Sequence, residues 1–190
     1  MRVFIAVDIG ENIRRAMGDL QKRLADAADV KKGDVKWVDP GSVHITLKFL
    51  GEINDEKAAE VCNIVRDAAA ASRRFELEVK SVGSFGGGSA KILWAGAGEH
   101  DGGLLGLQKD IERRMVLAGW PAEEREFTGH LTLCRIKSHK AGLKLADAAK
   151  QYRDIKLGVT AVDSVSVYSS DLTPKGPVYT VLGRYELGKI

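Results

Sequence analysis

Two of the four histidines in this chain begin the same kind of tetrapeptide, His44 in HITL and His130 in HLTL. In both runs polar and apolar residues alternate, which is typical of a β-strand. Side chains alternate along a strand, so each histidine shares a face with the threonine two residues later, Thr46 or Thr132. The apolar residues between them would anchor the opposite face in a core. Each strand therefore offers an imidazole and a hydroxyl side by side.

Two such strands facing one another would suit phosphoryl chemistry. Imidazole titrates near neutral pH, so one ring can accept a proton while the other donates one. Opening a 2′,3′-cyclic phosphate on RNA or a nucleotide needs both acts, because a base must activate water and an acid must protonate the departing ribose oxygen. The threonine hydroxyls can donate hydrogen bonds to the non-bridging phosphate oxygens. We therefore predict that His44, His130, Thr46 and Thr132 are catalytic, without a metal ion or other cofactor.

A metal site is the rival interpretation of the same residues. By simple alternation Cys134 shares the face of His130, so His44, His130 and Cys134 form a possible set of zinc ligands. The sequence has no Asp or Glu near either histidine on the same strand face, which weakens this hypothesis. A single His-x-Thr is also compatible with simple packing. His100 and His139 lie in polar, loop-like contexts and are expected at the surface.

The rest of the chain alternates strand-like and helix-like segments. Periodicity predicts strands over 3–7, 35–38, 44–50, 75–82, 91–97, 130–136, 163–168 and 178–187, with turns at 86–88 and 173–176. Helices are predicted over 13–24, 54–69, 104–115 and, more weakly, 143–152, with Asn54 and Asp101 as N-caps. Adjacent strand pairs favour sheets that are partly antiparallel. The two His-x-Thr copies, in matching contexts, favour two similar lobes.

Size and composition place this chain among ordinary globular proteins. Its 190 residues suit one compact domain, or two small lobes that share a core. A net charge of +3 and a pI of about 8.8 favour anionic partners only weakly. Two cysteines build no disulfide framework, and no apolar run resembles a signal peptide or approaches the roughly 18 residues of a membrane span. We expect a cytoplasmic monomer that does not contact a membrane.

Several segments, spread over almost the whole chain, resemble the 2′-5′ RNA ligase family (LigT-like), which belongs to the two-histidine phosphoesterases. The first histidine signature is WVDPGSVHITLKFLGEI over Trp37–Ile53, and the second is FTGHLTLCRI over Phe127–Ile136. The opening RVFIAVDI, the central SFGG…KILWAG and the closing VYSSDLTPKGPVYTVLGRYEL are similar to other elements of that family. Both signatures and the tail occur in the family's order, which is highly specific.

The resemblance implies an α+β fold, with residues 1–190 forming one two-lobed phosphoesterase domain. Antiparallel sheets related by a pseudo-twofold axis would line a central cleft, with helices packed outside. It implies hydrolysis of RNA 2′,3′-cyclic phosphate ends to 2′-phosphomonoesters, and in some members the reversible, ATP-independent joining of tRNA halves through a 2′-5′ linkage. It gives His44 the acid role and His130 the base role. A module that binds RNA or nucleotide ends without turnover is the alternative from another class.

Three further residues are candidates for substrate binding. Lys48 lies on the histidine face if its strand is regular, where it would meet a neighbouring phosphate. Phe49 and Arg135 match positions that the family uses around the nucleotide, but simple alternation points them away from that face, and only a β-bulge or the end of the strand would bring them back. Two residues depart from the family pattern. Gly129 stands where proline usually precedes the histidine, and Lys91 replaces an arginine, which removes bidentate phosphate recognition.

Overall fold

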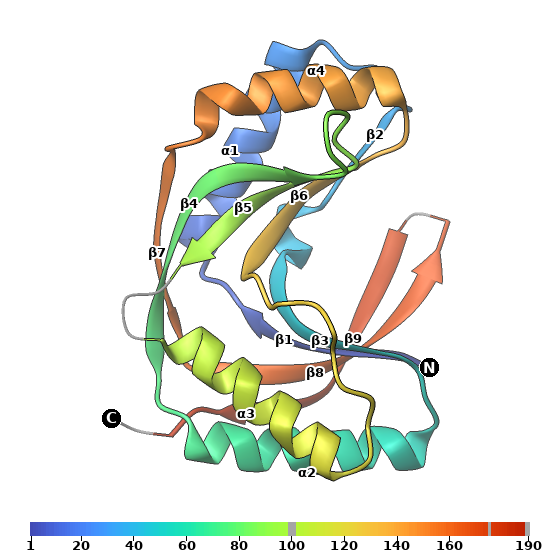
Figure 1. Cartoon of the computed structure of the whole chain (residues 1–190), viewed down its shortest axis with the longest axis vertical. Coiled ribbons are helices and arrows are strands. Elements are labelled where there is room, and N and C mark those ends of the chain that lie inside the picture. Colours follow the sequence, from blue (N-terminus) through green and yellow to red (C-terminus); the bar gives the residue numbers. More distant parts are fainter. Residues whose placement is uncertain (99–101, 175, 189–190) are drawn as a thin grey trace.

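The computed structural model describes residues 1–98, 102–174 and 176–188, which form two antiparallel β-sheets and four α-helices (Figure 1). The first sheet has the order β3-β1-β8-β9 and consists of β1 (Arg2–Asp8), β3 (His44–Glu52), β8 (Ser164–Thr173) and β9 (Gly176–Glu186). The second has the order β2-β6-β5-β4-β7 and consists of β2 (Val35–Trp37), β4 (Phe75–Phe85), β5 (Ile92–Gly98), β6 (His130–Ile136) and β7 (Lys156–Val162). The helices are α1 (Glu11–Ala28), α2 (Asp55–Ala71), α3 (Gly103–Leu117) and α4 (His139–Ala149), with short 3₁₀ helices η1 (Pro40–Ser42) and η2 (Lys150–Tyr152). The predicted α+β class is confirmed.

The two sheets repeat one arrangement around the histidine strands. β3 pairs antiparallel with β1, and β6 pairs antiparallel with β5. Each histidine is the first residue of its strand, so His44 and His130 occupy equivalent positions. The second sheet differs by one additional strand, β2, beyond β6. The predicted pair of similar lobes is therefore present, and Figure 1 shows the two sheets lying opposite one another.

The helices are exchanged between the sheets. α1 follows β1 of the first sheet, but it packs against β6 and β7 of the second sheet and against α4. α3 follows β5 of the second sheet and still contacts β4 of that sheet, but it also contacts β3 of the first sheet and packs on α2, which covers β8 and β9. The apolar face of α1 is fully buried at Ile13, Met17 and Leu20, as its periodicity predicts. Each lobe is thus built from both halves of the sequence.

The helix boundaries follow from their capping residues. α2 begins as predicted, because the side chain of Asn54 accepts a hydrogen bond of 2.9 Å from the backbone N–H of Lys57. α4 begins earlier than predicted, at His139, because Ser138 caps it. The predicted cap of the third helix, Asp101, lies outside the described residues. No helix in the described part of the chain is long and apolar enough to cross a membrane.

One strand, β7, is missing from the prediction. Its sequence, KLGVTAV, contains Gly158 at a φ of 133°, a conformation that breaks the regular alternation of a strand. Only Thr160 and Val162 of this strand are buried, so its apolar pattern is weak. β7 forms because it pairs with β4 along the edge of the second sheet. That pairing partner lies far away in the sequence, where local periodicity gives no signal.

Both histidine strands carry a β-bulge at the same place. In β3, Ala6 pairs with Thr46 and Ile5 with Lys48, so Leu47 is the extra residue. In β6, Trp94 pairs with Thr132 and Leu93 with Cys134, which leaves Leu133 as the extra residue. A bulge reverses which side chains point to which face from that residue onward. The burial of the side chains agrees with these bulges, because in both strands two consecutive buried residues are followed by an exposed one.

These bulges correct the prediction for Lys48 and explain Phe49 and Arg135. Lys48 does not share the face of His44: it points to the opposite side and is buried. Simple alternation would direct Phe49 and Arg135 away from the histidine face. Because of the bulges, both lie on that face and are exposed. Cys134 likewise turns from the histidine face into the core, where its exposure is 0%.

The buried side chain of Lys48 predicts a test of stability. Its Nζ lies 2.7 Å from Glu112 Oε2 and donates to the carbonyl of Pro121 at 3.2 Å, with only 6% of the side chain exposed. Because Lys48→Ala leaves the partly buried carboxylate of Glu112 without its cation, we expect the free energy of unfolding to fall by about 3 kcal/mol. The exposed pair of Lys22 and Asp19 is the control, and Lys22→Ala should cost less than about 1 kcal/mol. Urea denaturation measures both, and equal losses would contradict the buried role.

Candidate active site

His44 is held by one hydrogen bond at the start of β3. Its Nδ1 lies 2.9 Å from the carbonyl oxygen of Ser42, the last residue of η1. A carbonyl oxygen only accepts, so Nδ1 must carry the proton in this bond. The neutral ring then has its lone pair on Nε2, which is left for a substrate.

His130 repeats this arrangement in the second sheet. Its Nδ1 lies 2.8 Å from the carbonyl oxygen of Thr128, again the residue two positions earlier. The same argument places the proton on Nδ1 and leaves Nε2 as the acceptor. Both imidazoles therefore present the same nitrogen, from equivalent positions in the two lobes. Each can take a proton at Nε2, or donate one from Nε2 when the ring is charged.

The charge of Arg135 on the second sheet acts on Tyr179 on the first. Tyr179 lies on β9 of the first sheet, and its ring centroid is 5.2 Å from that of His44, in an edge-on arrangement. Burial raises the pKa of Tyr179, and the positive charge of Arg135 on β6 of the second sheet partly offsets that rise. β3 and β6 are also in contact. The faces that carry His44 and Arg135 are therefore opposed.

The two threonines lie where alternation predicts. Thr46 and Thr132 precede the bulges, so each shares the face of its histidine. Both side chains are half-buried, and within the described residues neither hydroxyl has a protein hydrogen-bond partner. Both hydroxyls are thus available as donors to an anion placed between the histidines.

Aromatic rings surround the two histidines unequally. The ring of His44 stacks on Phe4, with centroids 4.8 Å apart and an angle of 24° between planes. Phe4 also contacts Phe49, at 6.0 Å, and Phe49 is 68% exposed, so one of its faces is free to stack on a base. The ring of His130 lies 5.3 Å from that of Phe85, nearly perpendicular to it, and 6.3 Å from that of Trp94, and neither ring is stacked on it. The aromatic cover is therefore heavier around His44.

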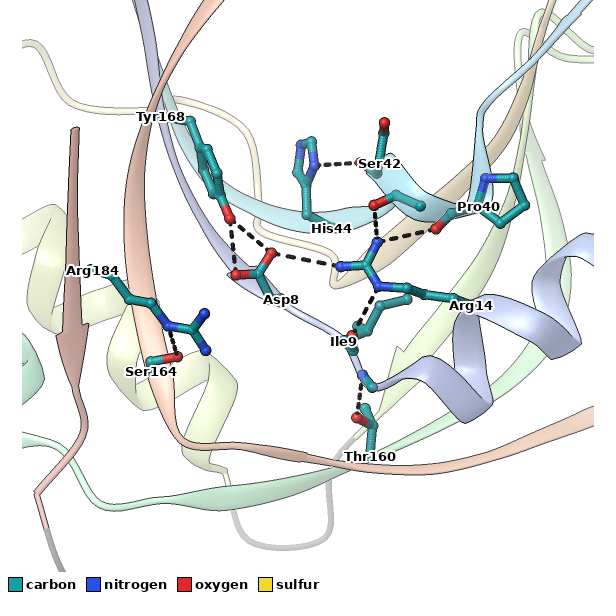
Figure 2. Close-up of polar contacts among 12 residues, drawn as sticks. Asp8, Ile9, Arg14, Pro40, Ser42, His44, Thr160, Ser164, Tyr168 and Arg184 are labelled. Atoms are coloured by element: carbon teal, nitrogen blue, oxygen red, sulfur yellow. Dashed lines mark hydrogen bonds and ion pairs between the residues drawn. The ribbon is translucent and has the colours of Figure 1, made fainter. Parts of the chain in front are cut away.

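A fixed carboxylate acts on His44. Asp8 stands directly opposite His44 in the pairing of β1 and β3, and both of its oxygens accept hydrogen bonds from the hydroxyl of Tyr168, at 2.8 and 2.9 Å (Figure 2). Arg14 lies 3.8 Å from the same carboxylate and donates to the carbonyl oxygens of Pro40 and Gly41. This network ties β1, β8, α1 and η1 together beneath the histidine.

Burial lowers the pKa of His44 below its ordinary value of 6.5. The hydrogen bond to Ser42 and the charge of Asp8 act in the opposite direction, and Arg14 adds to the lowering. Alternation along β3 gives no signal for Asp8, because this residue lies on the neighbouring strand, β1. The available signal is that Asp8 directly follows the predicted strand 3–7, but placing it opposite His44 requires the register of the sheet.

The zinc hypothesis loses one of its three ligands. Cys134 is turned into the core by the bulge, and burial raises the pKa of its thiol to about 12, which disfavours the thiolate that zinc requires. No cluster of three or more His, Cys, Asp or Glu side chains suited to a metal exists among the described residues. His139 is exposed at the start of α4, as expected, and His100 lies outside the described residues.

Gly129, which departs from the family pattern, fills a tight position. A Cβ on this residue would lie 2.8 Å from a methyl carbon of Leu104 and 2.9 Å from the carbonyl oxygen of Ala97. The carbonyl of Gly129 also accepts a hydrogen bond from the backbone N–H of Ala97, at 3.0 Å. The segment before His130 is therefore packed closely against α3 and β5 and is not loosened by the glycine. Lys91 is exposed just before β5.

Two opposed strands that begin with oriented histidines and carry free threonine hydroxyls define a two-histidine phosphoesterase. The family model described as "LigT like Phosphoesterase" matches residues 7–94 and 97–179. The chain belongs to this family. It is 32% identical over 186 residues to an RNA 2′,3′-cyclic phosphodiesterase of Methanocaldococcus jannaschii, covering 97% of this chain and 100% of that protein. It is 31% identical over 182 residues to the enzyme of the same name from Aquifex aeolicus, covering 95% and 96%.

Solved structures agree with this assignment. The crystal structure of TT0787 of Thermus thermophilus superposes with a TM-score of 0.80 at 28% identity, covering 98% of each chain. E. coli LigT, crystallised with 3′-AMP, superposes with a TM-score of 0.75 at 23% identity, covering 98% of this chain and 97% of that one. Because E. coli LigT is only 23% identical to this chain, its likeness is evidence for the fold alone.

The surroundings of His44 predict its titration. In an NMR titration of the imidazole signals, His44 should titrate below 6.5, because burial opposes its charged form. Asp8→Asn should lower that pKa further, because the carboxylate stabilises the imidazolium. Asp19→Asn, which removes an exposed carboxylate on α1, is the matched control and should leave it unchanged. A rise in the pKa of His44 on Asp8→Asn would refute this electrostatic account.

Proposed function

We propose that this protein is an RNA 2′,3′-cyclic phosphodiesterase that forms 2′-phosphomonoesters by acid–base catalysis with His44 and His130. The observation that carries the proposal is the matched pair of Nδ1–carbonyl hydrogen bonds, at 2.9 and 2.8 Å, which leaves Nε2 of both rings for the substrate. The relatives that are named RNA 2′,3′-cyclic phosphodiesterase and align over nearly the whole chain support the choice of substrate.

The reaction uses one proton transfer at each histidine. Nε2 of His130 takes a proton from water as the water oxygen bonds to phosphorus. The bond between phosphorus and the ribose 3′ oxygen breaks, and Nε2–H of the His44 imidazolium protonates the departing oxygen. The product has a 2′-phosphate and a 3′-hydroxyl. The assignment of acid and base follows the family resemblance. The surroundings of His44 support it, because its lowered pKa makes the His44 imidazolium a stronger acid than an ordinary one, and Asp8 stabilises the charged form.

Four other side chains complete the proposed site. Thr46 and Thr132 donate hydrogen bonds to the non-bridging oxygens, where charge grows as water adds to phosphorus. Phe49 stacks on the terminal base, since its ring is 68% exposed on the histidine face. Arg135 supplies positive charge next to Tyr179. Lys48 has no part in this site, because its ammonium is buried against Glu112.

We also propose that residues 1–190 act as one two-lobed domain, a cytoplasmic monomer acting on RNA ends. The placement of α1 supports the single domain: α1 follows β1 of the first sheet but buries its apolar face against the second, so neither half of the sequence could form a lobe by itself. Both cysteines, Cys62 and Cys134, are free thiols, which fits a reducing compartment. Gel filtration with light scattering measures the oligomeric state.

The first test of function is hydrolysis of a short RNA that ends in a 2′,3′-cyclic phosphate, in the presence of EDTA. Wild type should yield a 2′-phosphate, and His44→Ala or His130→Ala should lower kcat by about 10²–10⁴-fold, because each removes one proton transfer. His139→Ala replaces an exposed histidine outside the site and should retain full activity. Binding without turnover in wild type would contradict the enzyme and favour a binding module. Loss of activity in EDTA with recovery in zinc would favour the metal hypothesis.

Removing a threonine hydroxyl should lower kcat by less than removing a histidine. Thr132→Val keeps the shape of the side chain but removes the hydroxyl, so kcat should fall by about 10²-fold while folding is unchanged. Thr180→Val, which alters a threonine on β9, is the control and should have little effect. Single-turnover kinetics distinguishes slower chemistry from weaker binding. Unchanged single-turnover rates for Thr132→Val would show that its hydroxyl does not contact the reacting phosphate.

A further inference from the structure

Two cations stand directly opposite one another on the second sheet. Lys36 of β2 pairs in register with Arg135 of β6, so both side chains point to the same face. Because the bulge returns Arg135 to the face of His130, Lys36 lies on that face too. Both side chains are exposed. Sequence periodicity offers no hint of this pair, because the two residues are far apart along the chain.

This juxtaposition is unfavourable without an anion. Like charges directly opposite on neighbouring strands destabilise a sheet. Among residues 1–98, 102–174 and 176–188, no carboxylate forms an ion pair with either Lys36 or Arg135. Within the described residues, the fold therefore holds two cations together without a protein counter-ion. An anionic ligand would relieve the repulsion and gain from both charges.

Lys36 and Arg135 lie on the histidine face, but away from the reacting phosphate. Arg135 lies five residues after His130. Because the bulge takes up one of these residues, Arg135 lies roughly 13 Å from His130 along the strand. Arg135 acts on Tyr179, whose ring meets His44, and Lys36 is one strand farther out. A phosphate held between the histidines is thus too far from Lys36 for contact.

Lys36 also reaches toward the other lobe. A Cβ built on Gly176, where β9 begins, would lie 3.9 Å from Lys36 Nζ. The ammonium therefore lies between β2 of the second sheet and the β8–β9 hairpin of the first. A strand of RNA that leaves the reaction centre in that direction would pass this charge.

We propose that Lys36, together with Arg135, binds a backbone phosphate upstream of the cyclic end of single-stranded RNA. This subsite rests on the proposed function and refines it: the preferred substrate is an oligonucleotide rather than a cyclic mononucleotide. Lysine acts here as a point charge on a phosphate and reads no base, so the preference is for chain length and not for sequence.

The test compares kcat/KM for a 2′,3′-cyclic mononucleotide with kcat/KM for a short RNA that has the same cyclic end. Lys36→Ala should lower the ratio of oligonucleotide to mononucleotide by about fivefold, and should reduce the salt dependence of oligonucleotide binding by the contribution of about one phosphate. Lys22→Ala removes the same charge from the outer surface of α1 and should leave the ratio unchanged. Lys36→Arg should preserve the ratio.

A chemically modified RNA identifies the contact itself. Oligonucleotides that carry a neutral methylphosphonate at one linkage in turn should show one upstream position where wild type loses more rate than Lys36→Ala does, because only Arg135 still senses that phosphate in the variant. An unchanged ratio in Lys36→Ala, or an equal loss in both proteins at every linkage, would overturn the inference while leaving the phosphodiesterase intact. Failure of wild type to open either substrate would instead overturn the proposed function, and the subsite with it.

Discussion

One hydrogen bond, made twice, orients the whole site. In each lobe the imidazole Nδ1–H donates to the carbonyl two residues before it, and this bond decides that Nε2 meets the substrate. The bond forms only if the segment before the strand is rigid. Around His44 that rigidity comes from η1, whose carbonyls accept from Arg14, and Arg14 in turn lies against Asp8. Around His130 it comes from close packing of Gly129 against Leu104.

The second constraint is the bulge that follows each histidine by three residues. Without it, the alternation of side chains would direct Lys48 and Cys134 toward the substrate and Phe49 and Arg135 into the core. With it, the buried cation pairs with Glu112, and an aromatic ring and a guanidinium join the histidine face. The same one-residue insertion, at the same place in both lobes, therefore determines which side chains surround the substrate.

The sequence predicts those parts of the site that depend on a single strand. His44 and Thr46 share a face because alternation holds over two residues, and the same is true of His130 and Thr132. The prediction for Lys48 is wrong because a bulge is a property of two paired strands, and their register is absent from local periodicity. Asp8 is not predicted for the same reason, because only the register of β1 with β3 places it opposite His44. β7 is missed because its glycine interrupts the pattern and its pairing with β4 is long-range.

The two lobes are alike in geometry and different in electrostatics. Where the first sheet places Asp8 opposite its histidine, the second places Gly96, and a Cβ there would lie 2.9 Å from the carbonyl oxygen of Lys80. One imidazole thus has a fixed anion and a stacked ring beside it, and the other has neither in the same place. Equivalent rings in unequal surroundings are suited to opposite roles in one proton-transfer reaction.

The most direct test of the central claim is a crystal structure with an RNA dinucleotide that ends in the 2′-phosphate product. The account predicts that Nε2 of His44 and Nε2 of His130 both lie within about 2.6–3.2 Å of oxygens at the reacting end, on opposite sides of the phosphorus. Both Nδ1–carbonyl hydrogen bonds should remain in place. A phosphate that contacts only one histidine, or a ring that has turned to present Nδ1, would contradict it.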